Sequence, residues 1–140
     1  AQKKSYGFAY TAELEERILR DLSQPHVAGL TLVGGEPFLS AKHLLALVRR
    51  IRAELPRTTV WSYSGYTWET LRIFADERRD LLRELDVLID GQFIAEERDE
   101  ARLPTFAGSA NQRLIDVPAS LATGAVVAYE APVVSEETGR

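Results

Sequence analysis

The chain has 140 residues, 45% of them hydrophobic and 27% charged, which suffices for one ordinary core but is too short for two full domains. Its 17 basic and 21 acidic residues give a net charge of -4, which disfavours a nucleic acid partner. It has no cysteine or methionine, so disulfides and thiolate metal sites are excluded, and no apolar run approaches the roughly 20 residues that cross a bilayer.

Both ends of the sequence bear on how the chain is organised. The start lacks the apolar core of a signal peptide, so we expect a cytoplasmic protein. It begins Ala1-Gln2-Lys3 rather than with methionine, and we expect a trimmed chain or one lacking an upstream segment. We expect one α/β domain over residues 1–131 and a flexible polar tail over residues 132–140.

The first half alternates helix and strand patterns. Residues 12–22 carry an apolar residue at every fourth position behind an acidic first turn, which predicts a helix. The apolar, β-branched run at 27–33 predicts a strand buried on both faces. Residues 41–54 place apolar side chains at helical spacing with arginines off that stripe, and Pro56 follows, so we expect an amphipathic helix there.

The alternation continues in the middle of the chain. Residues 58–63 predict a second strand, followed by a turn and a helix capped by Thr67. This helix is expected to break near Asp76 and to resume up to residue 85. Residues 87–89 predict a third apolar strand.

The last third carries weaker patterns. We expect a solvated charged loop at 96–102, a short helix at 118–122 and a last strand at 125–129. Strands separated by 10 to 15 helical residues indicate βαβ units, so the predicted fold is α/β with a parallel sheet.

Three turns of unusual composition follow the predicted strands. In an open parallel sheet, ligands bind at the carboxyl ends of the strands, where helix amino ends also direct their free N–H groups. One ligand could therefore contact all three turns, which are Gly34-Gly35-Glu36-Pro37, Ser64-Gly65-Tyr66 and Asp90-Gly91.

Each turn has a ligand-binding interpretation and a structural alternative. Glu36 can accept hydrogen bonds from an ammonium group, or it can be an exposed residue of a tight turn. Ser64 and Tyr66 can offer a hydroxyl and an aromatic face to a nucleoside, or form an ordinary turn. Asp90 can hold ribose hydroxyls or form the turn, whereas Asp86 is expected to be a structural cap.

Other polar and aromatic residues carry weaker signals. Asn111, Gln112 and Arg113 end a donor-rich segment that suits a carboxylate or a partner's backbone, with a solvated loop as the alternative. His26 and His43 lack a second ligand at metal spacing and are expected at the surface, and the two tryptophans, Trp61 and Trp68, in the core.

In order and spacing, four segments resemble the anaerobic ribonucleoside-triphosphate reductase-activating family. They are Gly29-Leu-Thr-Leu-Val-Gly-Gly-Glu-Pro37, Val60-Trp-Ser-Tyr-Ser-Gly-Tyr-Thr67, Asp86-Val-Leu-Ile-Asp-Gly-Gln-Phe93 and Gly108-Ser-Ala-Asn-Gln-Arg113. The similarity covers about residues 5–129. Ser-Gly-Tyr and Gly-Ser-x-Asn-Gln-Arg are more specific to this family than Gly-Gly-Glu-Pro, which many radical S-adenosylmethionine (SAM) proteins share.

This resemblance implies an oxidoreductase in which a [4Fe-4S] cluster binds SAM and Gly34 to Pro37 receive the SAM ammonium group. The 5'-deoxyadenosyl radical formed from SAM would take a hydrogen atom from a backbone glycine of the partner, the large subunit of anaerobic ribonucleotide reductase. Flavodoxin or ferredoxin would donate the electron. The cofactor-binding residues expected from the turns and the resemblance together are Gly34, Gly35, Glu36, Pro37, Ser64, Gly65, Tyr66, Asp90, Asn111, Gln112 and Arg113.

The absence of cysteine departs from the family pattern. The family's Cys-x3-Cys-x2-Cys loop lies just upstream of the region that matches residues 5–11, and thiolates hold such clusters. We therefore expect an incomplete radical-SAM-type partial barrel that lacks its first strand and cluster loop, with no metal ligand or catalytic residue of its own. The alternatives are a truncated activating enzyme, inactive as this chain, and a degenerate, cluster-free binding or scaffold subunit.

Overall fold

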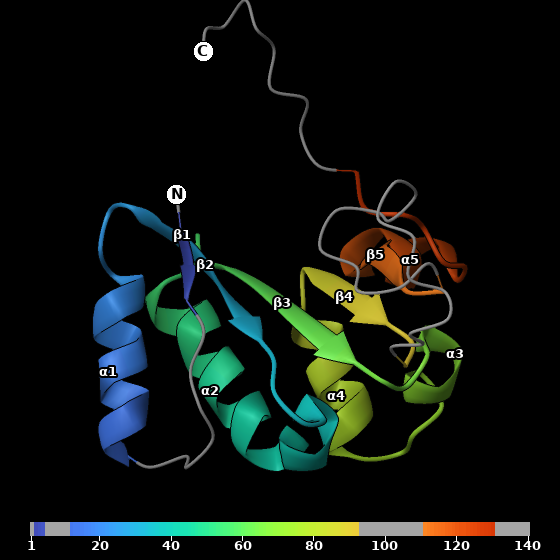
Figure 1. Ribbon diagram of the computed structural model, residues 1–140, viewed down its shortest axis with the longest axis horizontal. Helices are drawn as coiled ribbons and strands as arrows, with labels where there is room; N and C mark the ends of the chain where they lie inside the picture. Colours follow the sequence, from blue (N-terminus) through green and yellow to red (C-terminus); the bar gives the residue numbers. More distant parts are fainter. Residues whose placement is uncertain (1, 5–11, 93–110, 131–140) are drawn as a thin grey trace, which may run out of the picture.

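The fold is a twisted sheet covered by helices. The computed structural model describes residues 2–4, 12–92 and 111–130, and in these residues the sheet has five strands in the order β1-β2-β3-β4-β5 (Figure 1). Strands β1 to β4 run parallel, and β5 pairs with β4 in the antiparallel direction. The strand bounds are β1 Gln2–Lys4, β2 Val27–Leu32, β3 Thr59–Ser64, β4 Val87–Asp90 and β5 Arg113–Asp116.

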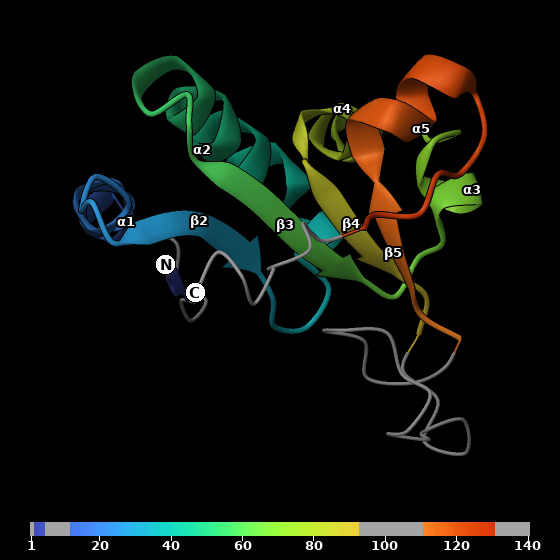
Figure 2. The ribbon, with the colours of Figure 1, turned by 90° about the horizontal axis from the view of Figure 1, so that it is seen from above.

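The helices α1 to α4 connect the parallel strands, and α5 follows the last strand. In chain order they are α1 Ala12–Leu22, the 3₁₀ turn η1 Pro37–Ser40, α2 Ala41–Glu54, α3 Trp68–Leu71, α4 Glu77–Glu84 and α5 Val117–Thr123. Figure 2 shows α2 and α4 side by side over one face of the sheet. The main core lies between these two helices and the sheet, where Val48 of α2 and Leu81 of α4 pack with the strand residues Leu30, Val60 and Leu88.

A smaller apolar cluster covers the opposite face of β3 and β4. Trp61, Val87 and Ile89 are buried there, and Trp61 meets the ring of Tyr129 edge to face at 5.2 Å between centroids. The second tryptophan, Trp68, is buried in the main core. The prediction that both tryptophans are core residues is therefore confirmed.

Most predicted elements are present in the structure. The helices predicted at 12–22 and 41–54 have those bounds, and the three internal strands agree to within one residue at either end. The predicted helix break is also confirmed, because α3 ends at Leu71 and α4 begins after Asp76, whose carboxylate accepts a hydrogen bond from the Arg78 N–H. The expected short helix near residues 118–122 is α5.

Three predictions about the edges of the sheet are wrong. The sheet is not wholly parallel, because β5 is antiparallel to β4. The first residue of β5, Arg113, lies beside the last residue of β4, Asp90. The first strand, which was expected to be missing, is not absent from the sheet, because β1 pairs beside β2. The strand predicted at 125–129 is reduced to one bridge between Ile115 and Ala128.

Other expectations concern the surface. His26 and His43 are exposed, as predicted. The charged loop expected at 96–102 and the tail expected at 132–140 lie outside the described residues. Within residues 2–4, 12–92 and 111–130, no helix has the length and hydropathy needed to span a bilayer.

Candidate cofactor site

The three turns singled out in the sequence gather at one edge of the sheet. Strands β2, β3 and β4 are parallel and adjacent, with Leu32 beside Ser62 and Ser64 beside Asp90. Their carboxyl ends therefore lie together, as do the turns that follow them (Figure 1). This is the edge at which open parallel sheets bind ligands.

Glu36 joins the first turn to the second. Its Oε2 atom accepts hydrogen bonds from the Phe38 N–H at 3.0 Å and from the Ser64 hydroxyl at 2.9 Å, and its Oε1 atom accepts one from the Gly65 N–H at 2.7 Å. Glu36 thereby caps η1 while it holds the turn after β3. Gly34, with a φ of 112°, supplies the left-handed backbone that aims the glutamate this way.

The carboxylate of Glu36 keeps capacity for one more donor. A carboxylate offers about four lone-pair sites, and the three hydrogen bonds above occupy two on Oε2 and one on Oε1. Glu36 is partly exposed. Beside it, a Cβ atom added at Gly35 would meet nothing within 4 Å, so the outer side of this turn has room for a ligand.

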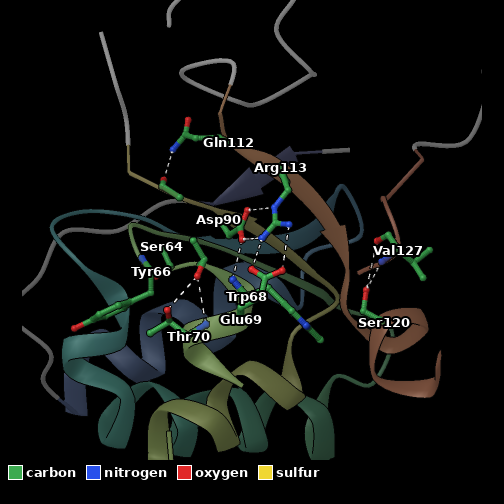
Figure 3. A network of polar contacts seen from close by, with 12 residues as sticks. Ser64, Tyr66, Trp68, Glu69, Thr70, Asp90, Gln112, Arg113, Ser120 and Val127 are labelled. Carbon is green, nitrogen blue, oxygen red and sulfur yellow. Dashed lines mark hydrogen bonds and ion pairs between the residues drawn. The ribbon is translucent and has the colours of Figure 1, made fainter. Parts of the chain in front are cut away.

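Ser64 and Tyr66 have largely internal contacts. The Ser64 hydroxyl donates to Glu36 and accepts from the Tyr66 N–H at 3.0 Å, and the residue is only 3% exposed. The Tyr66 ring packs edge to face on Phe74 with centroids 5.5 Å apart. Figure 3 shows this ring extending away from Asp90. Ser64 therefore shapes the turn.

Asp90 lies at the centre of a second, buried network (Figure 3). It is 1% exposed; Oδ2 accepts from the Trp68 N–H at 2.8 Å and from Arg113 Nη2 at 2.5 Å, and Oδ1 accepts from Arg113 Nε at 3.0 Å. Arg113 also pairs with Glu69 at 2.8 Å. The hydrogen bonds that Arg113 donates to Asp90, followed by those it donates to Glu69, raise the pKa of Arg113, and Arg113 in turn lowers the pKa of Glu69.

The amides that precede Arg113 bind the third turn. Gln112 donates from Nε2 to the Gly91 carbonyl at 2.9 Å, and Asn111 donates from Nδ2 to the Gln92 carbonyl at 2.7 Å. Gly91 has a φ of 99° and its N–H donates to the Tyr66 carbonyl, so the second and third turns are linked. The remainder of the predicted donor-rich segment, residues 108–110, lies outside the described residues.

Sequence reasoning missed the contribution of α3 to this edge. Glu69 and the Trp68 backbone complete the Asp90 network, although Glu69 did not stand out in the sequence and Trp68 was expected only as a core residue. The available signal was the Thr67 cap, which places Glu69 in the first turn of a helix that begins at the carboxyl end of β3.

The chemistry of the donor set limits which cofactors the chain can hold. There is no cysteine in the sequence, and the described residues contain no group of three or more acidic or histidine side chains that could hold a metal ion.

A pocket of about 330 Å³ lies behind the first turn, between α1, β2 and α2, with mostly aliphatic walls that include Leu14, Leu44 and Pro37.

Comparison with known proteins gives the family. The chain is 39% identical over 112 residues to the anaerobic ribonucleoside-triphosphate reductase-activating protein of Vibrio cholerae, a match covering 77% of this chain and 69% of the relative. The protein of that name from Haemophilus influenzae is 37% identical over 112 residues, with the same coverage. The one from Enterobacteria phage T4 is 31% identical over 113 residues, covering 77% and 65%.

This chain belongs to the anaerobic ribonucleoside-triphosphate reductase-activating protein family. A family model described as a 4Fe-4S single cluster domain also matches residues 1–115. No solved structure matches the chain. The resemblance inferred from the four sequence segments is thus confirmed. The chain matches a 4Fe-4S domain family although its own 140 residues include no cysteine.

Proposed function

We propose that this activating-family chain carries the SAM-binding part of an oxidoreductase that generates a glycyl radical on the large subunit of anaerobic ribonucleotide reductase. The names of the relatives support the reductase as partner, and the 4Fe-4S family match supports cluster chemistry. A flavodoxin or ferredoxin would donate the electron. In this proposal the sheet is part of a radical-SAM-type partial barrel and the protein works in the cytoplasm.

The geometry of Glu36 carries the SAM part of the proposal. Its carboxylate lies at the carboxyl edge of β2, is held in place by Ser64 and Gly65, and retains one acceptor direction on Oε1. An ammonium group such as that of SAM would satisfy this direction with a charge-assisted hydrogen bond. The open space at Gly35 allows a ligand to approach the backbone of the turn.

Three of the remaining predicted site residues, Asp90, Asn111 and Gln112, make contacts that hold the turn after β4. Asp90 is buried and its carboxylate accepts from Trp68 and Arg113, so we assign it to positioning the turn after β4 rather than to contacting ribose. Gln112 and Asn111 hold that same turn through its carbonyls. The residues that would contact SAM are therefore Gly34 to Pro37 and the backbone of Gly65.

The cluster itself does not fit the residues present. Iron-sulfur clusters are held by cysteine thiolates, and the chain has none. We assign no cluster step to this chain. The activity belongs to a longer form that carries the cysteine loop, and the chain alone is proposed to be inactive.

The same absence favours a second candidate function. A cluster-free family member that keeps the edge network could bind the reductase without activating it. Glu36, Asp90 and Arg113 make their contacts within the fold whether or not a cluster is present, so the edge would persist in such a scaffold subunit.

The direct test is calorimetric titration of the 140-residue chain with SAM, repeated with Glu36→Gln. We expect the variant to lose about tenfold in affinity, since one charge-assisted hydrogen bond is removed. Glu77→Gln is the matched control, because Glu77 is exposed in the first turn of α4. Absence of SAM binding by the wild type, or equal losses in both variants, would reject the SAM site.

A second experiment separates the two candidate functions. A form carrying the cysteine loop is reconstituted anaerobically with iron and sulfide, reduced, and assayed for 5'-deoxyadenosine in the presence of SAM. The activating function predicts a coloured protein and release of this product, while the 140-residue chain stays colourless. A colourless extended protein that still co-purifies with the reductase subunit would favour the scaffold function.

A further inference from the structure

A second polar pocket lies away from the candidate cofactor edge. It measures about 190 Å³ and is enclosed by α3, α4 and α5. Three arginines line it, Arg72 after α3 and Arg79 and Arg83 on α4, together with Trp68 and the carboxyl end of α5. Arg72 and Arg83 are exposed and Arg79 is partly buried, so the lining of this pocket carries positive charge.

None of the three arginines forms an ion pair with an acidic side chain in the part of the chain that the structure describes, although Arg72 lies near enough to Glu69, and Arg79 to Asp76, for their charges to interact. The ion pairs found there are formed by other arginines: Arg78 pairs with Asp76, and Arg113 pairs with Glu69. Arg79 is partly buried, and its Nε atom is shielded from solvent without a hydrogen-bond partner. A buried guanidinium donor of this kind calls for an acceptor.

An independent observation concerns the tryptophan that lines the same pocket. Trp68 is 2% exposed, and its indole Nε1 is also buried without a hydrogen-bond partner. Buried indole N–H groups usually find an acceptor. The two residues that carry orphaned donors in the described part of the chain thus line a single pocket, whose lining has three arginines and no carboxylate.

We propose that the pocket between α3, α4 and α5 binds a phosphate-type dianion, either inorganic phosphate or the phosphate group of a small metabolite. A phosphate oxygen can accept from the Trp68 indole while others accept from the guanidinium groups, and arginine suits this geometry. Its charge and several acceptor oxygens match the donor set better than a carboxylate. The proposal does not depend on SAM binding, because these side chains lie outside the Glu36 site.

Trp68 connects the two regions of the molecule. Its backbone N–H is bound to Asp90 at the candidate cofactor edge, while its side chain lines the anion pocket. The chemical shift of the Trp68 indole N–H therefore reports on changes in the pocket. Trp61 is an internal control, since it lies in the separate cluster on the other face of the sheet.

The experiment is a ¹H–¹⁵N NMR titration of the labelled 140-residue chain with inorganic phosphate at constant ionic strength. Two indole resonances are expected, and Trp68→Phe identifies the one that belongs to Trp68. We expect phosphate to shift that resonance and leave the Trp61 resonance in place, while acetate has no comparable effect. Glucose 6-phosphate in a parallel titration distinguishes a phosphate monoester from the free ion.

Variants test the charge component. Arg79→Gln is expected to weaken phosphate binding by about tenfold, whereas Arg20→Gln, which removes one exposed charge on α1, leaves binding unchanged. Arg72→Gln serves the same purpose if Arg79→Gln does not fold. The proposal is overturned if phosphate leaves the Trp68 indole unmoved, if acetate acts equally, or if Arg20→Gln weakens binding as much as the pocket variants.

Discussion

Replacement of Asp90 by asparagine tests the network that shapes the candidate cofactor edge. The carboxylate is 1% exposed and accepts from the Trp68 N–H and from two nitrogens of Arg113. Asparagine keeps the shape but turns one acceptor into a donor, which must then face either an N–H of Trp68 or one of Arg113. The change therefore removes the ion pair with Arg113 and leaves a buried N–H donor facing another N–H donor.

The expected loss in the free energy of unfolding follows from these contacts. Breaking a fully buried pair costs about 3–5 kcal/mol. The Arg113 side chain is 41% exposed and keeps Glu69 as a second partner, so we expect a smaller loss of about 2–3 kcal/mol.

Urea unfolding monitored by circular dichroism measures this loss. Glu69→Gln is the matched control, because Glu69 binds the same arginine but is 61% exposed, and we expect it to lose less than about 1 kcal/mol. A loss below about 0.5 kcal/mol in Asp90→Asn, or equal losses in the two variants, would refute the view that Asp90 anchors this edge.

Two further predictions concern packing and pH. Gly29→Ala is expected to destabilise the chain by about 1–3 kcal/mol, because its Cβ would lie 2.5 Å from the Thr59 carbonyl oxygen, whereas Gly35→Ala, with nothing within 4 Å, should change little; chemical unfolding compares the two. Arg113 holds the pKa of Glu69 below its ordinary 4.5, so the stability that Glu69 adds is present above pH 4.5 and is lost as pH falls below it. The difference in melting temperature between wild type and Glu69→Gln should shrink over that range, and a difference that grows on acidification contradicts the assignment.

The local pattern of the chain determined its helices and internal strands. Apolar spacing in α1 and α2 and the β-branched runs of β2 and β3 are properties of short segments, so they could be interpreted without knowing the fold. The order of these segments also indicated parallel strands, and therefore that Glu36, Ser64 and Asp90 would lie at one edge. The family motifs could be recognised for the same reason, because each is one continuous segment of the sequence.

Only the tertiary structure decided how the polar groups at that edge are used. Asp90 could hold a ribose or form a turn as far as the sequence showed, and its contacts with Trp68 and Arg113, 22 and 23 residues away, are what engage it in the fold. The antiparallel course of β5 and the gathering of Arg72, Arg79 and Trp68 around one pocket likewise depend on long-range packing. Periodicity records which face of a segment is buried, but the partner of a buried polar group is set by segments distant in the chain.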